Sequence, residues 1–218
     1  SFLGGVQDIF NLSAERSPSV FDIRHRFSLA LLYDTPKPAF GNAAVNYVFS
    51  GWQMGSIVTV STGFASNLGG VGDTTGTGVS SRPSVVAGQQ AILSRDERSR
   101  DRWFNTDAFF VTPLGQFGNA ARQPIYLPGM YNVDLSVTRN FRIVEGHAVQ
   151  FRAEFFNFLN HVNLGAPGLA ITAPQNFGVI TTARQGAAGI ENEGRVILFA
   201  LKYSFLWVLA PSTLPGLA

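Results

Sequence analysis

The sequence contains no cysteine and few charged residues. Without cysteine the chain has no disulfide framework and no thiol chemistry. Charged residues make up 14% of the chain, against about 25% in a typical soluble domain. Only Lys37 and Lys202 are lysines, the net charge is +2, and the basic residues form no cluster. Because nucleic-acid binding requires a basic patch, we expect no nucleic-acid partner.

Long hydrophobic runs are also missing. No segment approaches the roughly 18–20 consecutive apolar residues that a membrane-spanning helix requires. Yet 45% of the residues are hydrophobic, with 19 Phe, 23 Gly and 11 Pro. Apolar residues divided into short pieces are typical of a β-rich protein with one apolar face, and a lipid-facing sheet is one such case. The first residues, SFLGGVQDIF, lack the charged and apolar regions of a signal peptide, so this start resembles the middle of a longer polypeptide.

Alternating apolar and polar residues predict five strands. The second strand carries Trp52, Met54, Val58 and Val60 on one face, and its β-branched end IVTVST favours a strand over a helix. The stretch FRAEFFNFLNHVNLGAP fits both a helix and a strand, but the alternation just before the short turn VEGHA favours a hairpin. That strand is expected to end at a bulge or turn near Phe156. The predicted strands are residues 24–33, 44–61, 132–143, 148–155 and 195–205.

The connections between these strands alternate in length. Short turns are expected at 34–43 and 144–147, and long loops at 62–130 and 160–194. Short periplasmic turns and long extracellular loops are typical of a transmembrane β-barrel. We therefore predict an all-β fold, an antiparallel transmembrane-type β-barrel segment of about five long strands in an incomplete barrel. Residues 1–205 would be the C-terminal portion of the barrel, and 206–218 an apolar, proline-rich tail.

Several motifs together resemble the C-terminal part of TonB-dependent outer-membrane receptors, in the subgroup with a carboxypeptidase-regulatory-like N-terminal domain. The motifs are, in order, GWQMGSIVTVSTGFA, RWFNTDAFF, FGNAARQ, LPGMYNVDLSVTRNFRI, FRAEFFNFLNHVNLGAP and NFGVITTAR. The resemblance covers about residues 20–205 and rests on order and spacing. It implies an outer-membrane protein that takes up a bulky nutrient, with this chain supplying wall and loops only.

The resemblance also implies partners and a terminal signal. Family members have a signal peptide, a plug domain, an energy-coupling box and a 22-stranded barrel, of which this sequence shows only part of the barrel. Partners would be outer-membrane lipid, the remaining strands and the plug, with TonB coupling through N-terminal parts absent here. The stripe Phe199, Leu201, Tyr203 and Phe205 looks like the C-terminal signal read by the barrel-assembly machinery, although residues 206–218 follow it.

Five strands are too few to close a membrane barrel, whose minimum is about eight. Unpaired strand edges in lipid are costly, so the missing strands come either from the same parent polypeptide or from further copies of the chain. The second case predicts a self-assembling structural β-protein, a ring or a filament, which would be extracellular if released. A soluble β-sandwich binding module is a third hypothesis.

Catalytic and cofactor sites are not expected. His25, His147 and His161 lack metal-ligand neighbours at useful spacing. The stretch GGVGDTTGTG at 69–78 misses the spacing and lysine of a phosphate loop and predicts a flexible surface loop. No G-x-S-x-G elbow is present, and Arg152 and Glu154 are interpreted as charges on one sheet face. We expect no enzyme activity, no metal and no cofactor.

Aromatic residues are the remaining candidates for a site. The candidate interfacial aromatics are Trp52, Tyr131 and Trp207, with Tyr203 and Phe205 alongside them. Ordinary core packing between two sheets explains them equally well. Trp103, Phe104, Phe109 and Phe110 follow the mixed-charge run RDERSRDR in the first long loop. They are candidate extracellular-loop contacts, and packing on the barrel rim is the favoured interpretation.

Overall fold

The computed structural model describes residues 5–36, 41–184 and 194–205. The chain divides into two compact units, each described here by itself. The first comprises Ser1–Phe27, Thr59–Tyr131 and His161–Gly194, and the second Ser28–Val58, Asn132–Asn160 and Arg195–Ala218. The predicted tail at 206–218, with Trp207, lies outside the described residues. Within the described ranges, no helix has the length and apolar character needed to cross a membrane.

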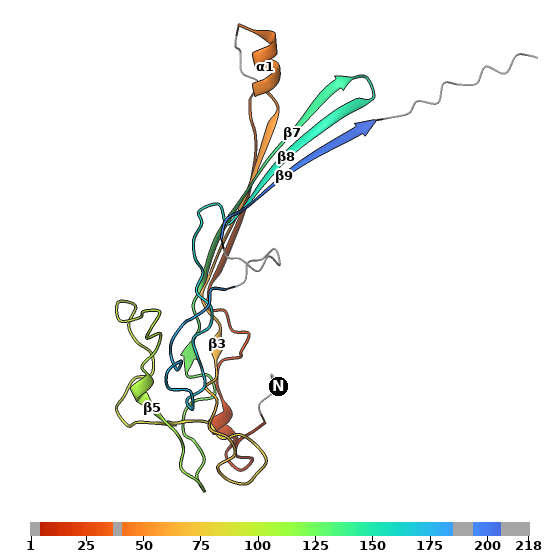
Figure 1. Ribbon diagram of the computed structural model, residues 1–218. Coiled ribbons are helices and arrows are strands. Elements are labelled where there is room, and N and C mark those ends of the chain that lie inside the picture. The colour runs from red at the N-terminus through yellow and green to blue at the C-terminus, as the bar shows by residue number, and fades with distance from the viewer. Residues whose placement is uncertain (1–4, 37–40, 185–193, 206–218) are drawn as a thin grey trace, which may run out of the picture. The chain divides into compact units, whose positions relative to one another are not determined.

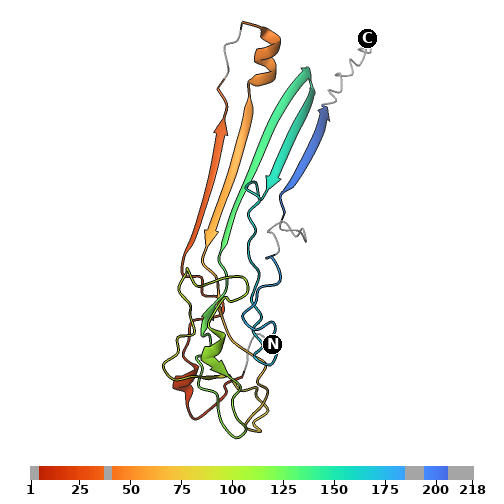
Figure 2. The same cartoon turned by 60° about the vertical axis from the view of Figure 1, so that its left-hand side comes forward.

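A five-stranded antiparallel sheet dominates the second unit, in the order β1-β2-β7-β8-β9 (Figures 1 and 2). Alternation of apolar and polar residues in these segments matches the two-residue period of a strand. The predicted fold class is therefore confirmed, and the strand ends differ from the expected ones by only a few residues outside β2. The strands are β1 (Arg26–Asp34), β2 (Trp52–Ser61), β7 (Met130–Val144), β8 (His147–Phe156) and β9 (Val196–Phe205).

The pairing of the last three strands is nearly regular. β8 pairs with β9 from His147↔Phe205 to Phe156↔Val196 without interruption. β7 pairs with β8 in the same antiparallel sense, with one register shift between Arg142 and Val144 beside the hairpin turn. β8 ends at Phe156, and Asn157 follows with φ 50°, so the expected change of direction is a turn.

The predicted strand at 44–61 is wrong over its first part. Residues Ala43–Phe49 form a short helix, α1, and only Trp52–Ser61 form β2. The Asn42 side chain accepts hydrogen bonds from the backbone N–H of Ala44 and Val45, which caps the helix. Gly51, at φ 73°, then turns the chain into β2, a conformation that glycine adopts without strain. The connection between β1 and β2 therefore contains a helix and is longer than the predicted turn at 34–43.

The predicted loops at 62–130 and 160–194 form most of the first unit, and their described parts, which leave out residues 185–193, are packed together. Two-stranded pairs join β3 (Ala65–Ser66) to β6 (Ile125–Tyr126) and β4 (Ser84–Val85) to β5 (Phe109–Phe110). Two 3-10 turns, η1 (Leu12–Glu15) and η2 (Thr106–Ala108), complete the unit. The unit has its own buried core, made of Leu68, Phe104, Ala108, Phe109, Ala120, Ile125 and Phe177.

Aromatic contacts link distant parts of this core. The ring of Phe104 meets that of Phe177 edge-on at 5.1 Å between centroids, and that of Phe109 at 6.1 Å. Gly118 lies so close to the backbone of Arg82 that an added Cβ would come within 1.8 Å of its carbonyl oxygen. Segments of this unit therefore pack directly backbone against backbone, with only short strands and 3-10 turns between them.

The stretch at 69–78, predicted to be flexible, is an organised turn. The Asp73 carboxylate accepts hydrogen bonds from the backbone N–H groups of Thr75, Gly76, Thr77 and Gly78, at 2.7–3.3 Å. These bonds, led by that from Gly78, lower the pKa of Asp73 below its usual value. The prediction overlooked that an aspartate at the head of such a stretch orders the backbone that follows it.

Candidate functional site: a sheet with two chemically different faces

The strand register sorts the side chains of β7, β8 and β9 onto opposite faces. Residues directly paired across neighbouring strands point to the same side of a sheet. The apolar face carries the rows Leu135–Phe155–Ile197, Val137–Ala153–Phe199, Arg139–Phe151–Leu201 and Phe141–Val149–Tyr203. The polar face carries the rows Ser136–Glu154–Leu198, Thr138–Arg152–Ala200, Asn140–Gln150–Lys202 and Arg142–Ala148–Ser204.

β1 and β2 continue the same division. The Thr35 N–H donates to the Trp52 carbonyl at 2.8 Å, and the Gln53 amide donates to Asp34 at 3.1 Å, which fixes their register. The Trp52 ring meets Phe141 and Phe151 edge-on, so its side of β2 belongs to the apolar face. On that side the alternation then places Phe27, Leu29, Leu31 and Tyr33 of β1 and Met54, Val58 and Val60 of β2.

Much of the apolar face is exposed in the described structure, most of all on β9. On β9, Phe199 is 70% exposed and Leu201 75% exposed. Burial of apolar surface is favourable by about 25 cal/mol per Å², and a contiguous exposed patch marks an interface with protein or membrane. A soluble β-sandwich would cover this face with a second sheet, so the structure gives that hypothesis no support.

The two outer strands of the sheet carry unpaired edges. β1 and β9 stand at the ends of the strand order, each with a single neighbour among the described strands. Such edges present backbone N–H and C=O groups that pair readily with another strand. The sheet is therefore open on both sides.

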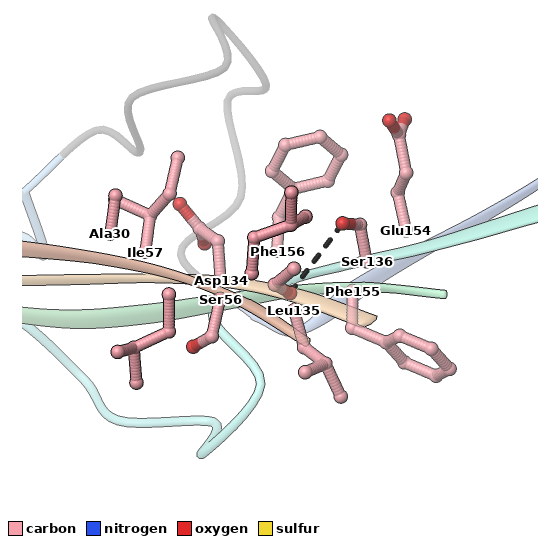
Figure 3. A pocket seen from close by; sticks show the side chains of 12 residues that line it. Ala30, Ser56, Ile57, Asp134, Leu135, Ser136, Glu154, Phe155 and Phe156 are labelled. Carbon is pink, nitrogen blue, oxygen red and sulfur yellow. Dashed lines mark hydrogen bonds between the residues drawn. The ribbon is translucent and has the colours of Figure 1, made fainter. Parts of the chain in front are cut away.

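The polar face contains a shallow cavity of about 410 Å³ across β1, β2, β7 and β8. Figure 3 shows Ile57, Asp134, Ser136, Glu154 and Phe156 on one side of the strands, and Ser56, Leu135 and Phe155 on the other. Alternation along each strand explains this division, and most of the residues that line the cavity belong to the polar face.

Gly55 makes room for the cavity. A Cβ at this position would lie 2.7 Å from the Ser136 hydroxyl oxygen and 3.8 Å from the Leu32 side chain. The Ser136 hydroxyl instead donates a long hydrogen bond of 3.5 Å to the Gly55 carbonyl. Since glycine weakens a strand interior, its presence here reflects close approach of the neighbouring side chain.

The charges near this cavity are already partnered. The Asp134 carboxylate accepts hydrogen bonds from the Asn132 amide at 2.9 Å and from the Asn157 backbone N–H at 3.0 Å. Glu154 forms an ion pair with Arg152 at 3.4 Å. These arrangements suit a hydrated wall, and the interpretation of Arg152 and Glu154 as sheet-face charges agrees with their register.

The three histidines lie apart. His147 contacts the Tyr203 hydroxyl at the start of β8, His161 meets the Tyr131 ring edge-on, and the backbone N–H of His25 donates to the Thr62 hydroxyl. Among the residues that the structure describes, no group of three or more His, Cys, Asp or Glu side chains is placed to hold a metal ion.

The predicted terminal stripe is continuous. Phe199, Leu201, Tyr203 and Phe205 lie on one face of the edge strand β9. Trp52 is half-buried at the start of β2, and Tyr131 is the second residue of β7.

The aromatic residues predicted as loop contacts divide between core and surface. Phe104 and Phe109 are 2% and 7% exposed, so both lie in the core of the first unit. Trp103 is half-buried and donates from Nε1 to the Tyr126 carbonyl at 2.7 Å. Only Phe110 of the four is exposed, at 44%. Phe104 and Phe109 are therefore not accessible for an external contact, because they fill the interior that the sequence pattern did not reveal.

Arg139 is the residue that sequence reasoning missed. It stands in the apolar register of β7, between Val137 and Phe141, and is 4% exposed. Its Nη1 donates to the Val48 carbonyl at 2.6 Å, and its Nη2 donates to the Tyr47 carbonyl. The sequence marks this position as unusual, because an arginine interrupts an otherwise apolar stripe, but it does not reveal the partners of the arginine.

Comparison with protein families gives a match that covers most of the chain. The family model of the outer membrane beta barrel domain matches residues 2–197. No curated protein and no solved structure matches the chain.

Proposed function

Because this chain belongs to the outer membrane beta barrel domain family, we propose that its sheet is part of the wall of a TonB-dependent receptor. That receptor would take up a bulky nutrient across the bacterial outer membrane. Family membership places the chain in an outer-membrane β-barrel. The finer assignment is supported by the ordered motifs from GWQMG to NFGVITTAR.

The observation that carries the proposal is the separation of the two faces by register. In a membrane barrel the outer side is apolar and meets lipid, and the inner side is polar. The apolar face, with Phe199 and Leu201 exposed, fits the outer side. The polar face, with the Asn140–Gln150–Lys202 row, fits the inner side.

The open edges indicate that the sheet continues into further strands. Five strands cannot close around a lumen, and lipid penalises unpaired backbone groups by several kcal/mol each. β1 and β9 therefore require neighbouring strands in the membrane. A receptor wall supplies them from the rest of the barrel, with a plug inside and TonB coupling through parts N-terminal to this chain.

The segments 62–130 and 160–194 would form part of the extracellular mouth. They connect β2 to β7 and β8 to β9. Their buried aromatic core gives the mouth a preformed shape, so binding a nutrient there would cost little conformational entropy. In this proposal the chain binds and conducts, and it catalyses no reaction.

Energised uptake tests this function. Cells that produce the protein would be given labelled nutrients too large for porins, such as metal chelates, oligosaccharides and peptides. We expect uptake of one class to stop when this segment is deleted and when the proton gradient is dissipated. Uptake that survives both treatments for every class would contradict the proposal.

A second candidate function rests on the same open edges. If no further strands are supplied, β1 of one copy can pair with β9 of the next, giving a ring or a filament. Negative-stain microscopy of the purified chain separates the two candidates. Ordered polymers or rings support self-assembly, and dispersed particles in detergent support the receptor wall.

A further inference from the structure

The helix α1 is fastened to the sheet at Arg139. The Arg139 guanidinium donates to the last carbonyls of the helix, at Tyr47 and Val48, and Trp52 Nε1 donates to the Val48 carbonyl at 3.0 Å. The Tyr47 hydroxyl donates to the Arg142 carbonyl of β7 at 2.6 Å. Helix ends leave such carbonyls without partners inside the helix, so the sheet satisfies the C-terminal end of α1. Figure 1 shows α1 at the end of β1 and β2.

The fastening lies on the apolar face. Arg139 shares this face with Phe141, and the two rings of Trp52 and Phe151 meet there edge-on at 6.0 Å. The Arg139 guanidinium carbon lies 4.5 Å from the ring centre of Phe141, 5.4 Å from that of Tyr47 and 5.6 Å from that of Trp52. Cation–π attraction therefore adds to the hydrogen bonds to the helix.

The depth of this arginine follows from its cost in lipid. An arginine on the outer face of a barrel is strongly destabilising at the membrane midplane and almost neutral near the interfaces. Tryptophan and tyrosine gather at the same interfaces. Arg139 with Tyr47 and Trp52 thus fits the lipid–water boundary, as the candidate role of Trp52 also requires.

The outer surface of α1 is apolar. Val45 is 37% exposed, Val48 48% and Phe49 59%, and the helix sequence AAVNYVF contains no charged residue. This surface adjoins the apolar face, because the helix docks on that side of β7 through Arg139. The continuity points to one occupant for both surfaces, and that occupant is lipid.

We propose that α1, held by Arg139, is an interfacial anchor whose Val45, Val48 and Phe49 side chains enter the headgroup–acyl boundary of the membrane's periplasmic leaflet. The inference rests on the proposed orientation of the sheet in the membrane. The anchor fixes the level at which the wall sits, because the guanidinium of Arg139 that holds the helix is costly to move toward the membrane midplane. A partner protein on this surface is the competing outcome.

Site-specific fluorescence quenching tests the anchor. The chain has no cysteine, so single-cysteine variants of the full chain can carry one environment-sensitive dye each in phosphatidylcholine vesicles. Phe49→Cys reports on α1, Phe199→Cys on the apolar face, and Asp96→Cys on an exposed charged segment. Position 199 lies six residues before Phe205, the last residue of β9. At ~3.3 Å per residue and ~45° tilt it should therefore lie about 14 Å deeper in the membrane than that end of the strand.

Lipids with quenchers at a shallow or a deep acyl position give the depth of each dye. We expect position 49 to lie about 5–10 Å below the headgroup boundary, as for interfacial helices. Position 199 should be quenched more by the deep lipid, and position 96 by neither. If position 199 is quenched and position 49 is not, the anchor is wrong and the membrane wall stands. If position 199 is not quenched, the result contradicts both the membrane wall and the anchor.

The hold of Arg139 on the helix is tested by changing Arg139 in two backgrounds, Phe49→Cys and Phe199→Cys. Arg139→Leu removes the guanidinium donors to both helix carbonyls and leaves only Trp52 Nε1 on Val48, so the shallow quenching at position 49 should be lost while the deep quenching at position 199 is unchanged. Arg139→Lys keeps the charge but has a single donor nitrogen in place of the two that bind Val48 and Tyr47, so it should retain part of the quenching. Unchanged quenching at position 49 in Arg139→Leu would show that the helix is held by other contacts.

Discussion

At the scale of single residues, neighbouring side chains of one strand lie in opposite environments. Val137 lies on the apolar face and Thr138 on the polar face of β7. Their backbone positions are adjacent, so differences between variants at these two sites report the environment of the side chain alone.

We predict that Val137→Arg destabilises the membrane-inserted chain by about 1–2 kcal/mol, because the guanidinium would enter lipid two residues deeper than the boundary level of Arg139. Thr138→Arg is the matched control and should cost less, because its guanidinium stays hydrated on the polar face and meets only the screened charge of Arg152 opposite it. Guanidinium-induced unfolding in vesicles measures both. Equal effects at the two positions would contradict the assignment of the faces.

Gly55 gives a second prediction at this scale. Gly55→Ala places a Cβ 2.7 Å from the Ser136 hydroxyl oxygen, so overpacking should cost about 1–3 kcal/mol. Ser136→Ala removes the atom that clashes, and the double variant should recover most of the loss. A double-mutant cycle measures the coupling, and additive losses would show that the close approach does not limit this position.

Some residues of the candidate site can be predicted from the sequence, and others cannot. The terminal stripe from Phe199 to Phe205 was predictable, since strict alternation fixes which side chains share a face. Arg139 was not assigned, because its partners Tyr47 and Val48 lie about 90 residues earlier in the chain. Hydrogen bonds between distant segments leave no periodic trace in a sequence.

At the scale of elements, strands were easier to predict than the helix. Val45, Tyr47 and Phe49 alternate with smaller or polar residues, as a strand would. A helix of seven residues is too short to show its own period. The cap at Asn42 was the only local sign of its start, and it was read as part of a turn.

The core within the long segments was hidden for a similar reason. Phe104 and Phe177 are far apart in sequence, yet their rings are 5.1 Å apart. Phe104→Ala should lower the stability of the first unit by about 3–5 kcal/mol. The exposed Phe110→Ala is the control, with a change of about 0.5 kcal/mol or less. Limited proteolysis of residues 62–130 measures the difference, and equal protection of both variants would argue against a packed core.

The turn around Asp73 predicts a dependence on pH. Its folded pKa is lowered by the backbone N–H groups of Gly78, Thr75, Thr77 and Gly76. The stabilisation is therefore present above the unfolded pKa and is lost as the pH falls through the folded value. The amide NMR signal of Gly78 should move with this titration, and in Asp73→Asn it should stay constant. A Gly78 signal that titrates equally in both proteins would contradict the bond.

At the scale of the whole molecule, the central claim is that the sheet separates lipid from a polar interior. Family membership and the open edges at β1 and β9 support a wall that continues into further strands. Composition predicted this class, since few charges and many short apolar segments suit a barrel wall.

Spin-label accessibility along β9 tests this claim most directly. One nitroxide is placed at each position from Val196 to Phe205 of the membrane-inserted chain. Contact with oxygen, which partitions into lipid, is then compared with contact with a polar nickel chelate. The account predicts a period of two residues, with oxygen maxima at Ile197, Phe199, Leu201, Tyr203 and Phe205 and chelate maxima between them. Profiles that rise and fall together, or that show no period, would contradict it.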